Sequence, residues 1–404
     1  MMDVYFKEIN VLQSIIDADY DDKFVLYQNY FDVIKDYAIT FVDDKVGKNN
    51  YKYMLDVLQI DSQYIFSPFH SNKLYTLNEE FVSSLSPMLY FFDISLDTNI
   101  VSYIDRFQRG TDLDGKPLEM VKRLGKHRQI ASTINLSPYL NENCLFEGQI
   151  NPHYKETIYN FFYYLNKFHH RWSFIAKRKS KKSTEMIIKN QEFLLNSPLA
   201  DIFKQQFKII YSSVLMIALL NLSNSNKKDK IIKLIDFMAN DIKAMDICLL
   251  EIAAVYFVKK QNLSFFGKLQ KGKKDIVDII KNLSWDIFHL RYQEFLLSVK
   301  PVKGIDVNLV LFCTLDKRLI EIQEIIKLKA IAYNTKTGNY YPFYQSEQVM
   351  KMLSKEEIHK YFQSEKHFDR ISTKMNIDYD NVISNLERSV ITSYSKSYEG
   401  ANKS

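Results

Sequence analysis

The sequence predicts an α/β protein whose core, built on a central parallel sheet, is interrupted by a large all-α insertion and flanked by helical N- and C-terminal extensions. Two apolar runs predict the sheet. Residues 89–96 and 307–313 are rich in strand-forming side chains, and a carboxylate follows each run within three residues. The insertion is predicted from composition, because residues 149–266 contain no glycine and only two prolines.

These patterns divide the chain of 404 residues, 46% of them hydrophobic, which is ample for a packed core. We expect a helical N-terminal extension at 1–85 and a helical C-terminal extension with a polar tail at 336–404. Between them lie the first part of the core at 86–148, the helical insertion at 149–240, and the second part of the core at 241–335.

Several features predict a cytoplasmic protein. Cys144, Cys248 and Cys313 lack the spacing of a zinc site or a disulfide framework, and two of them lie in apolar runs, which favours reduced, packed thiols. The first residues lack the basic-then-apolar pattern of a secretion signal. The longest apolar run, 209–222, is shorter than the roughly 20 residues that cross a bilayer, so we expect a buried core helix there.

The first apolar run ends in Asp97-Thr98-Asn99, and a second run that is predicted to be helical follows. Since functional crevices of open α/β sheets lie at the carboxyl ends of their strands, Asp97 is the first candidate site residue. The same residue types cap helices, so a capping role for Asp97 is an equal alternative. The next segment, 109–129, holds three glycines and one proline and is predicted to be a surface loop.

Two further carboxylates lie in apolar helical patterns. Glu251 needs a basic partner, a metal or a cleft, because an unpaired buried carboxylate is costly. Asp246, five residues earlier, is its nearest rival and would point to a different helix face. Asp286 is predicted to lie at the first turn of a helix, where capping by Ser284 or Asp286 is the strong alternative.

The second strand ends in Thr314-Leu315-Asp316, which repeats the arrangement at Asp97. Taken in order, the segments LDTN with Asp97, CLLE with Glu251, WDIFHL with Asp286 and FCTLD with Asp316 resemble the PIN-like nuclease family. One departure from the family pattern is the separation of Asp97 from Glu251 by more than 150 residues. An acidic residue within the intervening excursion is therefore an alternative second acid.

The resemblance implies a compact α/β sandwich with a carboxylate-bound Mg²⁺ or Mn²⁺ site. Its metal ligands would be Asp97, Glu251, Asp286 and Asp316, with Asn99 and Thr314 as accompanying catalytic-site residues. Carboxylate oxygens are hard ligands that suit these ions, and the ions would activate water for phosphodiester hydrolysis. The common use of the family adds a role as a toxin or defence effector.

A basic cluster lies in the helical insertion: Lys177, Arg178, Lys179, Lys181 and Lys182. Such a run binds phosphates or is a solvated helix face, and we expect it to contact nucleic acid, RNA more than DNA. Smaller basic patches at 227–230 and 268–274 would add a phosphate-binding surface if they fold onto one side. The nearby aromatic residues, which include Phe161, Tyr164, Phe168 and Trp172, are expected in a core stripe.

The leading expectation is a metal-dependent endoribonuclease that acts away from membranes and could bind a protein partner through its insertion. One alternative is a noncatalytic nucleic-acid-binding or regulatory protein with the same fold. Another is a helical interaction scaffold in which Asp97 and Asp316 are only turn residues. P-loop, dinucleotide-binding and HExxH patterns are absent from the sequence, which disfavours the corresponding enzyme classes.

Overall fold

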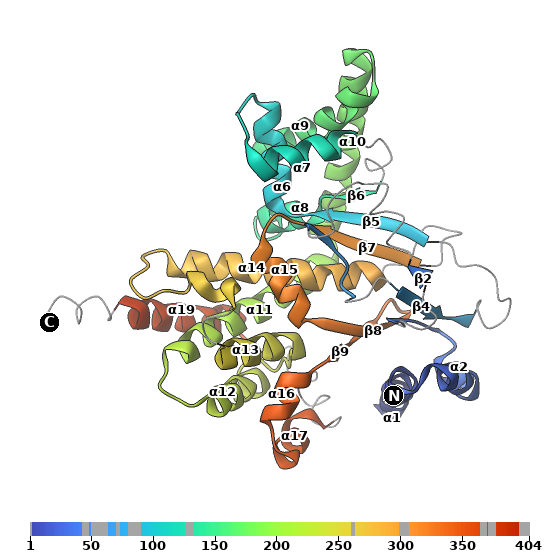
Figure 1. The fold of residues 1–404 in the computed structure, drawn as a ribbon, viewed down its shortest axis with the longest axis vertical. Coiled ribbons are helices and arrows are strands. Elements are labelled where there is room, and N and C mark those ends of the chain that lie inside the picture. The colour runs from blue at the N-terminus through green and yellow to red at the C-terminus, as the bar shows by residue number, and fades with distance from the viewer. Residues whose placement is uncertain are drawn as a thin grey trace, which may run out of the picture. The chain divides into compact units, whose positions relative to one another are not determined.

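The computed structural model describes most of the chain: residues 2–42, 48–49, 64–69, 73–79, 90–126, 133–259, 263–298, 307–363, 370 and 377–395. Its described part is a mixed α/β protein, mostly helical, with two small sheets (Figure 1). The chain forms two compact units. The first combines residues 1–204, 290–320 and 328–343, and the second combines 205–289, 321–327 and 344–404.

The first sheet lies in the first unit and has the strand order β3-β7-β5-β6. Strands β5 (Tyr90–Leu96) and β7 (Val307–Cys313) pair in parallel from Tyr90 opposite Val307 to Leu96 opposite Cys313. These two segments are far apart in the sequence and lie side by side in Figure 1. The two predicted strands therefore form the parallel pair that the sequence indicates, although Leu89 lies outside the described residues.

The two flanking strands of this sheet are short. Strand β6 (Ile134–Asn135) is parallel to β5, and β3 (Ile65–Phe66) is antiparallel to β7. Helices α6 (Thr98–Gln108), α8 (Ser137–Cys144) and α15 (Lys317–Ile325) begin directly after the parallel strands β5, β6 and β7. Each begins at the carboxyl end of its strand, where α/β folds place their sites.

In the first unit, helices α7 (Gly115–Lys126) and α9 (Pro152–His169) pack against α6, and α10 (Ser173–Leu195) packs against α9. Helix α9 begins where Asn151 accepts a hydrogen bond from the backbone N–H of Tyr154 at 3.1 Å. Helix α10 buries a row of small residues, Ala176, Ser180 and Thr184, at four-residue spacing. Helices α9 and α10 form the first half of the predicted all-α insertion.

Helix α7 corrects the prediction of a loop at 109–129. Its glycine at position 125 and Pro117 suggested a loop, but proline is tolerated in the first helical turn, where its missing N–H costs no hydrogen bond. Buried Met120, Val121 and Leu124 fix the helix onto its neighbours. Residues 127–132 lie outside the described chain.

The second sheet corrects the prediction of a purely helical N-terminal extension. Helices α1 (Met2–Asp17), α2 (Tyr20–Asn29) and α3 (Phe31–Ile34) are followed by strands β1 (Tyr37–Val42), β2 (Lys48–Asn49) and β4 (Lys73–Leu77). With β8 (Lys327–Asn334) and β9 (Tyr340–Gln345) these strands form an antiparallel sheet of order β2-β4-β1-β8-β9. Its core joins α1 residues such as Leu12 and Ile15 to Ile39 and Ala332. Because β8 lies about 290 residues after β1 in the chain, local periodicity cannot show the pairing.

The second unit is built mainly from helices. They are α11 (Pro198–Leu222), α12 (Lys227–Asn240), α13 (Ile247–Lys259), the 3₁₀ helix η3 (Ser264–Lys268), α14 (Ile276–Ser298), α16 (Glu347–Met352), α17 (Lys355–Phe362) and α19 (Tyr379–Ser395). Helices α11 and α14 each begin or end in the first unit. The predicted C-terminal polar tail lies outside the described residues from 396 onward.

Helix α11 is, among the described residues, the one helix long and apolar enough to cross a membrane by length and composition. The protein buries 61% of its apolar window. The run at 209–222 is part of this 25-residue helix, so the length argument against a membrane span does not hold, whereas the burial is what the predicted core helix requires. The three cysteines are likewise buried and free of disulfides.

Candidate functional site

Acidic side chains gather at the carboxyl edge of the parallel strands. Asp97 follows β5, Asp316 follows β7, and Glu142 lies on α8, the helix that follows β6. All three residues belong to the first compact unit. The parallel pairing brings them to one edge of the sheet because parallel strands end on the same side.

Thr314 links the ends of β5 and β7. Its Oγ1 donates a hydrogen bond to Oδ2 of Asp97 at 2.6 Å and accepts one from the backbone N–H of Asp316 at 2.9 Å. The backbone N–H of Asp97 donates to the carbonyl of Cys313 at 3.0 Å, which continues the strand pairing to the site. Thr314 is fully buried and Asp97 is 3% exposed. One hydroxyl therefore positions both strand-end acids.

Both aspartates also cap the helices that follow them. Oδ1 of Asp97 accepts from the backbone N–H of Asn99 at 3.5 Å, and the Asn99 side chain donates to Oδ2 at 3.4 Å. Oδ1 of Asp316 accepts from the backbone N–H and from Nε of Arg318, both at 2.9 Å. Arg318 also pairs with the second oxygen of Asp316. The capping role that the sequence offered as the alternative for Asp97 is therefore present, at the strand end where a site was expected.

Glu142 was missed as a named candidate in the sequence. Its Oε2 accepts a hydrogen bond from the Thr98 hydroxyl at 2.6 Å, so it lies against the first residue of α6. Burial, together with the nearby Asp97 carboxylate, raises the pKa of Glu142 to about 7. Burial also raises the pKa of Asp97, and Asp316 adds to the rise. Asp97 and Glu142 are therefore harder to ionise than ordinary carboxylic acids, mainly because both are buried.

A weak sequence signal for Glu142 did exist. Ser137-Pro138 opens α8, since proline favours the first helical positions, and Glu142 follows within two turns. Its strand, β6, has only two residues, too few for a period-two pattern to show. The alternative second acid was expected within the intervening excursion, and Glu142, on α8, lies outside it.

Glu251 has a different environment from the one expected. It belongs to the second unit, is 6% exposed, and its two oxygens accept from the backbone N–H groups of Gln348 at 2.7 Å and Val349 at 3.0 Å. These N–H groups open α16, so the buried carboxylate is satisfied by a helix N-terminus. Asp246 caps α13 by accepting from the N–H groups of Cys248 and Leu249. Both acids therefore have structural roles.

The prediction that Asp286 opens a helix is wrong. Asp286 lies in the middle of α14, ten residues after its start at Ile276. The Ser284 hydroxyl donates to the Ile280 carbonyl at 2.8 Å and does not cap the helix. The helix pattern extends further upstream than the Ser-Trp-Asp motif suggested, because Ile276, Ile280 and Leu283 continue the buried face.

The oxygen ligands at this edge of the sheet suit a hard divalent cation. In the structure, however, the three carboxylates do not already form a metal-binding cluster. Asp97, Glu142 and Asp316 offer only oxygen donors, and the raised pKa values mark charge that a cation would neutralise. Asp316 is held by Arg318. Throughout the described residues, no three His, Cys, Asp or Glu side chains are grouped closely enough to hold a metal ion.

All five side chains of the basic cluster are exposed on α10. The ion pair that the structure shows for them joins Lys181 to Glu185 at 4.0 Å. Of the aromatic residues expected in a core stripe, Phe161 and Tyr164 are buried, whereas Phe168 and Trp172 are 50% and 58% exposed. Because α9 ends at His169, Trp172 lies in the turn before α10 and leaves the stripe.

No family model, curated protein or solved structure gives a significant match to this chain. The resemblance to PIN-like nucleases therefore depends on the acidic segments and on the strands that carry them.

Proposed function

We propose that this chain is a metal-dependent endoribonuclease of the PIN-like kind, with Asp97, Glu142 and Asp316 as its acidic residues. The observation that carries the proposal is the hydrogen bond from Thr314 to Asp97, which joins two acids that are 219 residues apart in the sequence at adjacent strand ends. The proposed set has Glu142 in place of Glu251, whose carboxylate binds the N–H groups that open α16, and it leaves out Asp286.

The proposed cofactor is Mg²⁺ or Mn²⁺, held by the carboxylates of Asp97, Glu142 and Asp316. A bound ion would supply charge stabilisation for the scissile phosphate and a more acidic water. The protein's own part is to orient the acids: Thr314 fixes Asp97, and Thr98 fixes Glu142. The pKa of about 7 that Glu142 has without metal would fall on binding an ion, so ion binding would release a proton near neutral pH.

The exposed face of α10 is the proposed RNA-binding surface. Five cations carry the charge that phosphates need, and Trp172 offers an exposed ring for base stacking, with the Arg171 guanidinium 5.9 Å from the ring centre. The same helix continues to Gln191, which lines a pocket of about 300 Å³ together with Asp93 and Asn135. Asp93 lies on β5, four residues before Asp97, so this pocket links the helix to the strand that carries the site.

Cleavage of labelled single-stranded RNA in Mg²⁺ or Mn²⁺ tests the proposal. Asp97→Asn and Glu142→Gln should each abolish cleavage, and a chelator should do the same to the unchanged protein. Asp114→Asn, a change at an exposed aspartate of the same unit, is the matched control and should cleave normally. Glu251→Gln separates the two possible second acids, because it should lower stability without lowering cleavage per folded molecule.

The ion pair between Arg318 and Asp316 favours the second candidate, a noncatalytic RNA-binding protein, since it occupies one of the three acids. In that case the protein binds RNA through α10 and leaves it intact at every metal concentration. Intact RNA after incubation of folded protein that demonstrably binds Mn²⁺ and RNA would overturn the nuclease proposal and support this alternative.

A further inference from the structure

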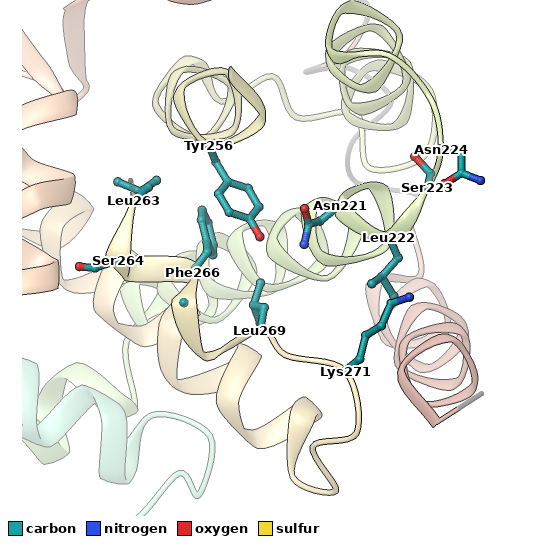
Figure 2. Close-up of a pocket in the computed structure, with 11 residues that line it drawn as sticks. Asn221, Leu222, Ser223, Asn224, Tyr256, Leu263, Ser264, Phe266, Leu269 and Lys271 are labelled. Carbon is teal, nitrogen blue, oxygen red and sulfur yellow. The ribbon is translucent and has the colours of Figure 1, made fainter. Parts of the chain in front are cut away.

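A pocket of about 540 Å³ lies within the second unit, away from the residues used above. It is formed by the end of α11, the loop after it, α13, and the segment around η3 (Figure 2). Its volume falls in the range of small-molecule sites, about 300–1,000 Å³. No part of the proposed nuclease site contributes to it, so what it binds is a separate question.

The floor of this pocket is apolar and fixed by the core. Tyr256 and Phe266 are 5% and 1% exposed, and their ring centres lie 4.5 Å apart. Leu263 and Leu269 are also buried. Figure 2 shows Tyr256, Phe266 and Leu269 grouped on one side, with Asn221 beside the Tyr256 hydroxyl. A flat apolar ligand group would be well accommodated against such a floor.

The Tyr256 hydroxyl is the feature that points to a ligand. It makes no hydrogen bond to any residue that the structure describes, although its side chain is almost wholly buried, and in Figure 2 it points toward the pocket. The hydroxyl oxygen itself is open to the pocket, so a ligand there can reach it without displacing a protein partner. Burial raises the pKa of Tyr256 to about 12, so the hydroxyl keeps its proton and can donate to a ligand acceptor.

The rim of the pocket is basic and amide-rich. Of the two small basic patches, 268–274 supplies the lining residue Lys271, whereas no residue of 227–230 lines the pocket. Lys227 donates to the Val258 carbonyl and Lys228 pairs with Glu357. Lys230 donates to the Asn221 carbonyl at 3.3 Å. The side chains of Lys268, Lys271, Lys273 and Lys274 are exposed, and none forms an ion pair within the described chain. The lysines of the 268–274 patch therefore give one side of the rim a positive charge.

We propose that this pocket binds a nucleoside monophosphate. The heterocyclic base lies on the apolar floor, where ring nitrogens and carbonyls accept from the Tyr256 hydroxyl and pair with the Asn221 amide. The phosphate stays at the rim, where Lys271 and its basic neighbours neutralise it. This combination of apolar floor, buried donor and cationic rim fits a ligand with a flat polar base at one end and an anion at the other.

Calorimetric titration of the full chain with AMP, GMP, CMP and UMP tests the site, with the matching nucleosides and inorganic phosphate as separate arms. At least one nucleotide should bind more tightly than its nucleoside and than phosphate. Lys271→Gln should weaken nucleotide binding about tenfold, the effect of removing one charge-assisted hydrogen bond, and leave nucleoside binding unchanged. Lys281→Gln, an exposed lysine of α14 that does not line the pocket, is the matched control.

Tyr256→Phe keeps the ring and removes the donor, so it should weaken nucleotide and nucleoside binding by the same factor. Its melting temperature, measured without ligand, should not fall, because the removed hydroxyl has no protein partner to leave unpaired. The proposal is overturned if no nucleotide binds at millimolar concentration, if phosphate alone binds as tightly as the nucleotides, or if Lys271→Gln and Lys281→Gln have equal effects.

Discussion

At the scale of single residues, the hydroxyl of Thr314 is the contact on which the acidic edge depends. It is fully buried, donates to Asp97 and accepts from the Asp316 backbone, so both its donor and one acceptor position are used. A valine of the same shape would leave a buried carboxylate oxygen without its nearest donor. The loss falls on Asp97, whose buried carboxylate would keep only its hydrogen bonds from Asn99.

We therefore expect Thr314→Val to lower the free energy of unfolding by about 1–3 kcal/mol at neutral pH, the cost of an unsatisfied buried group. Thr314→Ser retains the hydroxyl and should lose less, which makes it the control. Urea denaturation followed by circular dichroism measures both. Equal losses for valine and serine would assign the effect to the missing methyl group and not to the hydrogen bond.

Glu142 gives the second residue-scale prediction. Its pKa is about 7 in the folded chain, against an ordinary value near 4.5, so the unfolded chain loses this proton first as pH rises. Stability is thus fully present below about pH 4.5 and falls by about 3 kcal/mol by the time pH has risen through 7. Glu142→Gln should flatten this fall and be the more stable protein at pH 8. Thermal unfolding between pH 4.5 and 8 tests this.

Divalent ions extend the same experiment. If Mn²⁺ binds at these acids, it favours their ionised forms and should reduce the fall in stability of the unchanged protein, with less effect on Glu142→Gln. An unchanged pH profile in Mn²⁺ would argue against an ion at this edge.

The sequence correctly placed Asp97 and Asp316 after parallel strands, but it misjudged the positions and partners of the helical acids, for a physical reason. Asp97 and Asp316 follow long apolar strands, and the surroundings of a strand end are set by neighbours in the chain. The partners of Glu251 are backbone N–H groups nearly a hundred residues later, and no side-chain pattern reports them. Asp286 was misplaced because a capping motif inside a longer helix looks the same as one at its start.

At the scale of elements, a glycine that suggested a loop turns out to belong to a helix contact. A Cβ on Gly125 of α7 would meet the Tyr164 hydroxyl of α9 at 2.8 Å, and this hydroxyl donates to the Val121 carbonyl at 2.9 Å. The glycine is thus required for close approach of the two helices. Glycine in a helix signals a break when only the sequence is read, and only the partner helix explains it.

We expect Gly125→Ala to destabilise the protein by about 1–3 kcal/mol, because overpacking exceeds the gain of roughly 1 kcal/mol in helix propensity. The double variant Gly125→Ala with Tyr164→Phe removes the clashing oxygen and should recover part of the loss relative to Tyr164→Phe alone. Denaturant midpoints of the four proteins measure the coupling. Additive effects would show that Tyr164 does not set the requirement for glycine.

The antiparallel sheet shows the limit of prediction at the same scale. Strand β1 was hidden in an apolar segment with helical spacing, and it is a strand because β4 and β8 supply its pairing partners. Tertiary pairing overrides local preference in such segments. The helices of the insertion could be predicted without knowing their packing partners, because a long segment without glycine already indicates helices.

At the scale of the whole molecule, the question is whether the basic face of α10 serves the edge at Asp97. The cluster lies in the same compact unit as the acids, and its five side chains are solvent-exposed. Replacing them should therefore leave the fold intact. Variants of these exposed residues can therefore change RNA affinity without changing the stability of the fold or the acids at the sheet edge.

Neutralising Lys177, Lys179 and Lys181 to glutamine in an Asp97→Asn background should weaken binding of every RNA sequence alike. The log–log salt slope should fall by roughly 0.7 for each phosphate that the protein no longer neutralises. Three exposed lysines elsewhere in the chain, Lys7, Lys35 and Lys281, provide a control of equal charge change. Fluorescence anisotropy at several salt concentrations gives both affinity and slope, and equal slopes for the two triple variants would identify the cluster as a solvated face.

The parallel pairing of β5 with β7 also determines when the protein could first act in a cell. A growing chain contains Asp97, Glu142 and the basic helix early, yet Thr314 and Asp316 are added only near residue 316 of 404. Until then β5 lacks its neighbour, and long-range parallel pairing is slow to form. A nuclease with this topology would stay inactive on the ribosome, and the messenger RNA being translated would be spared until most of the chain had been made.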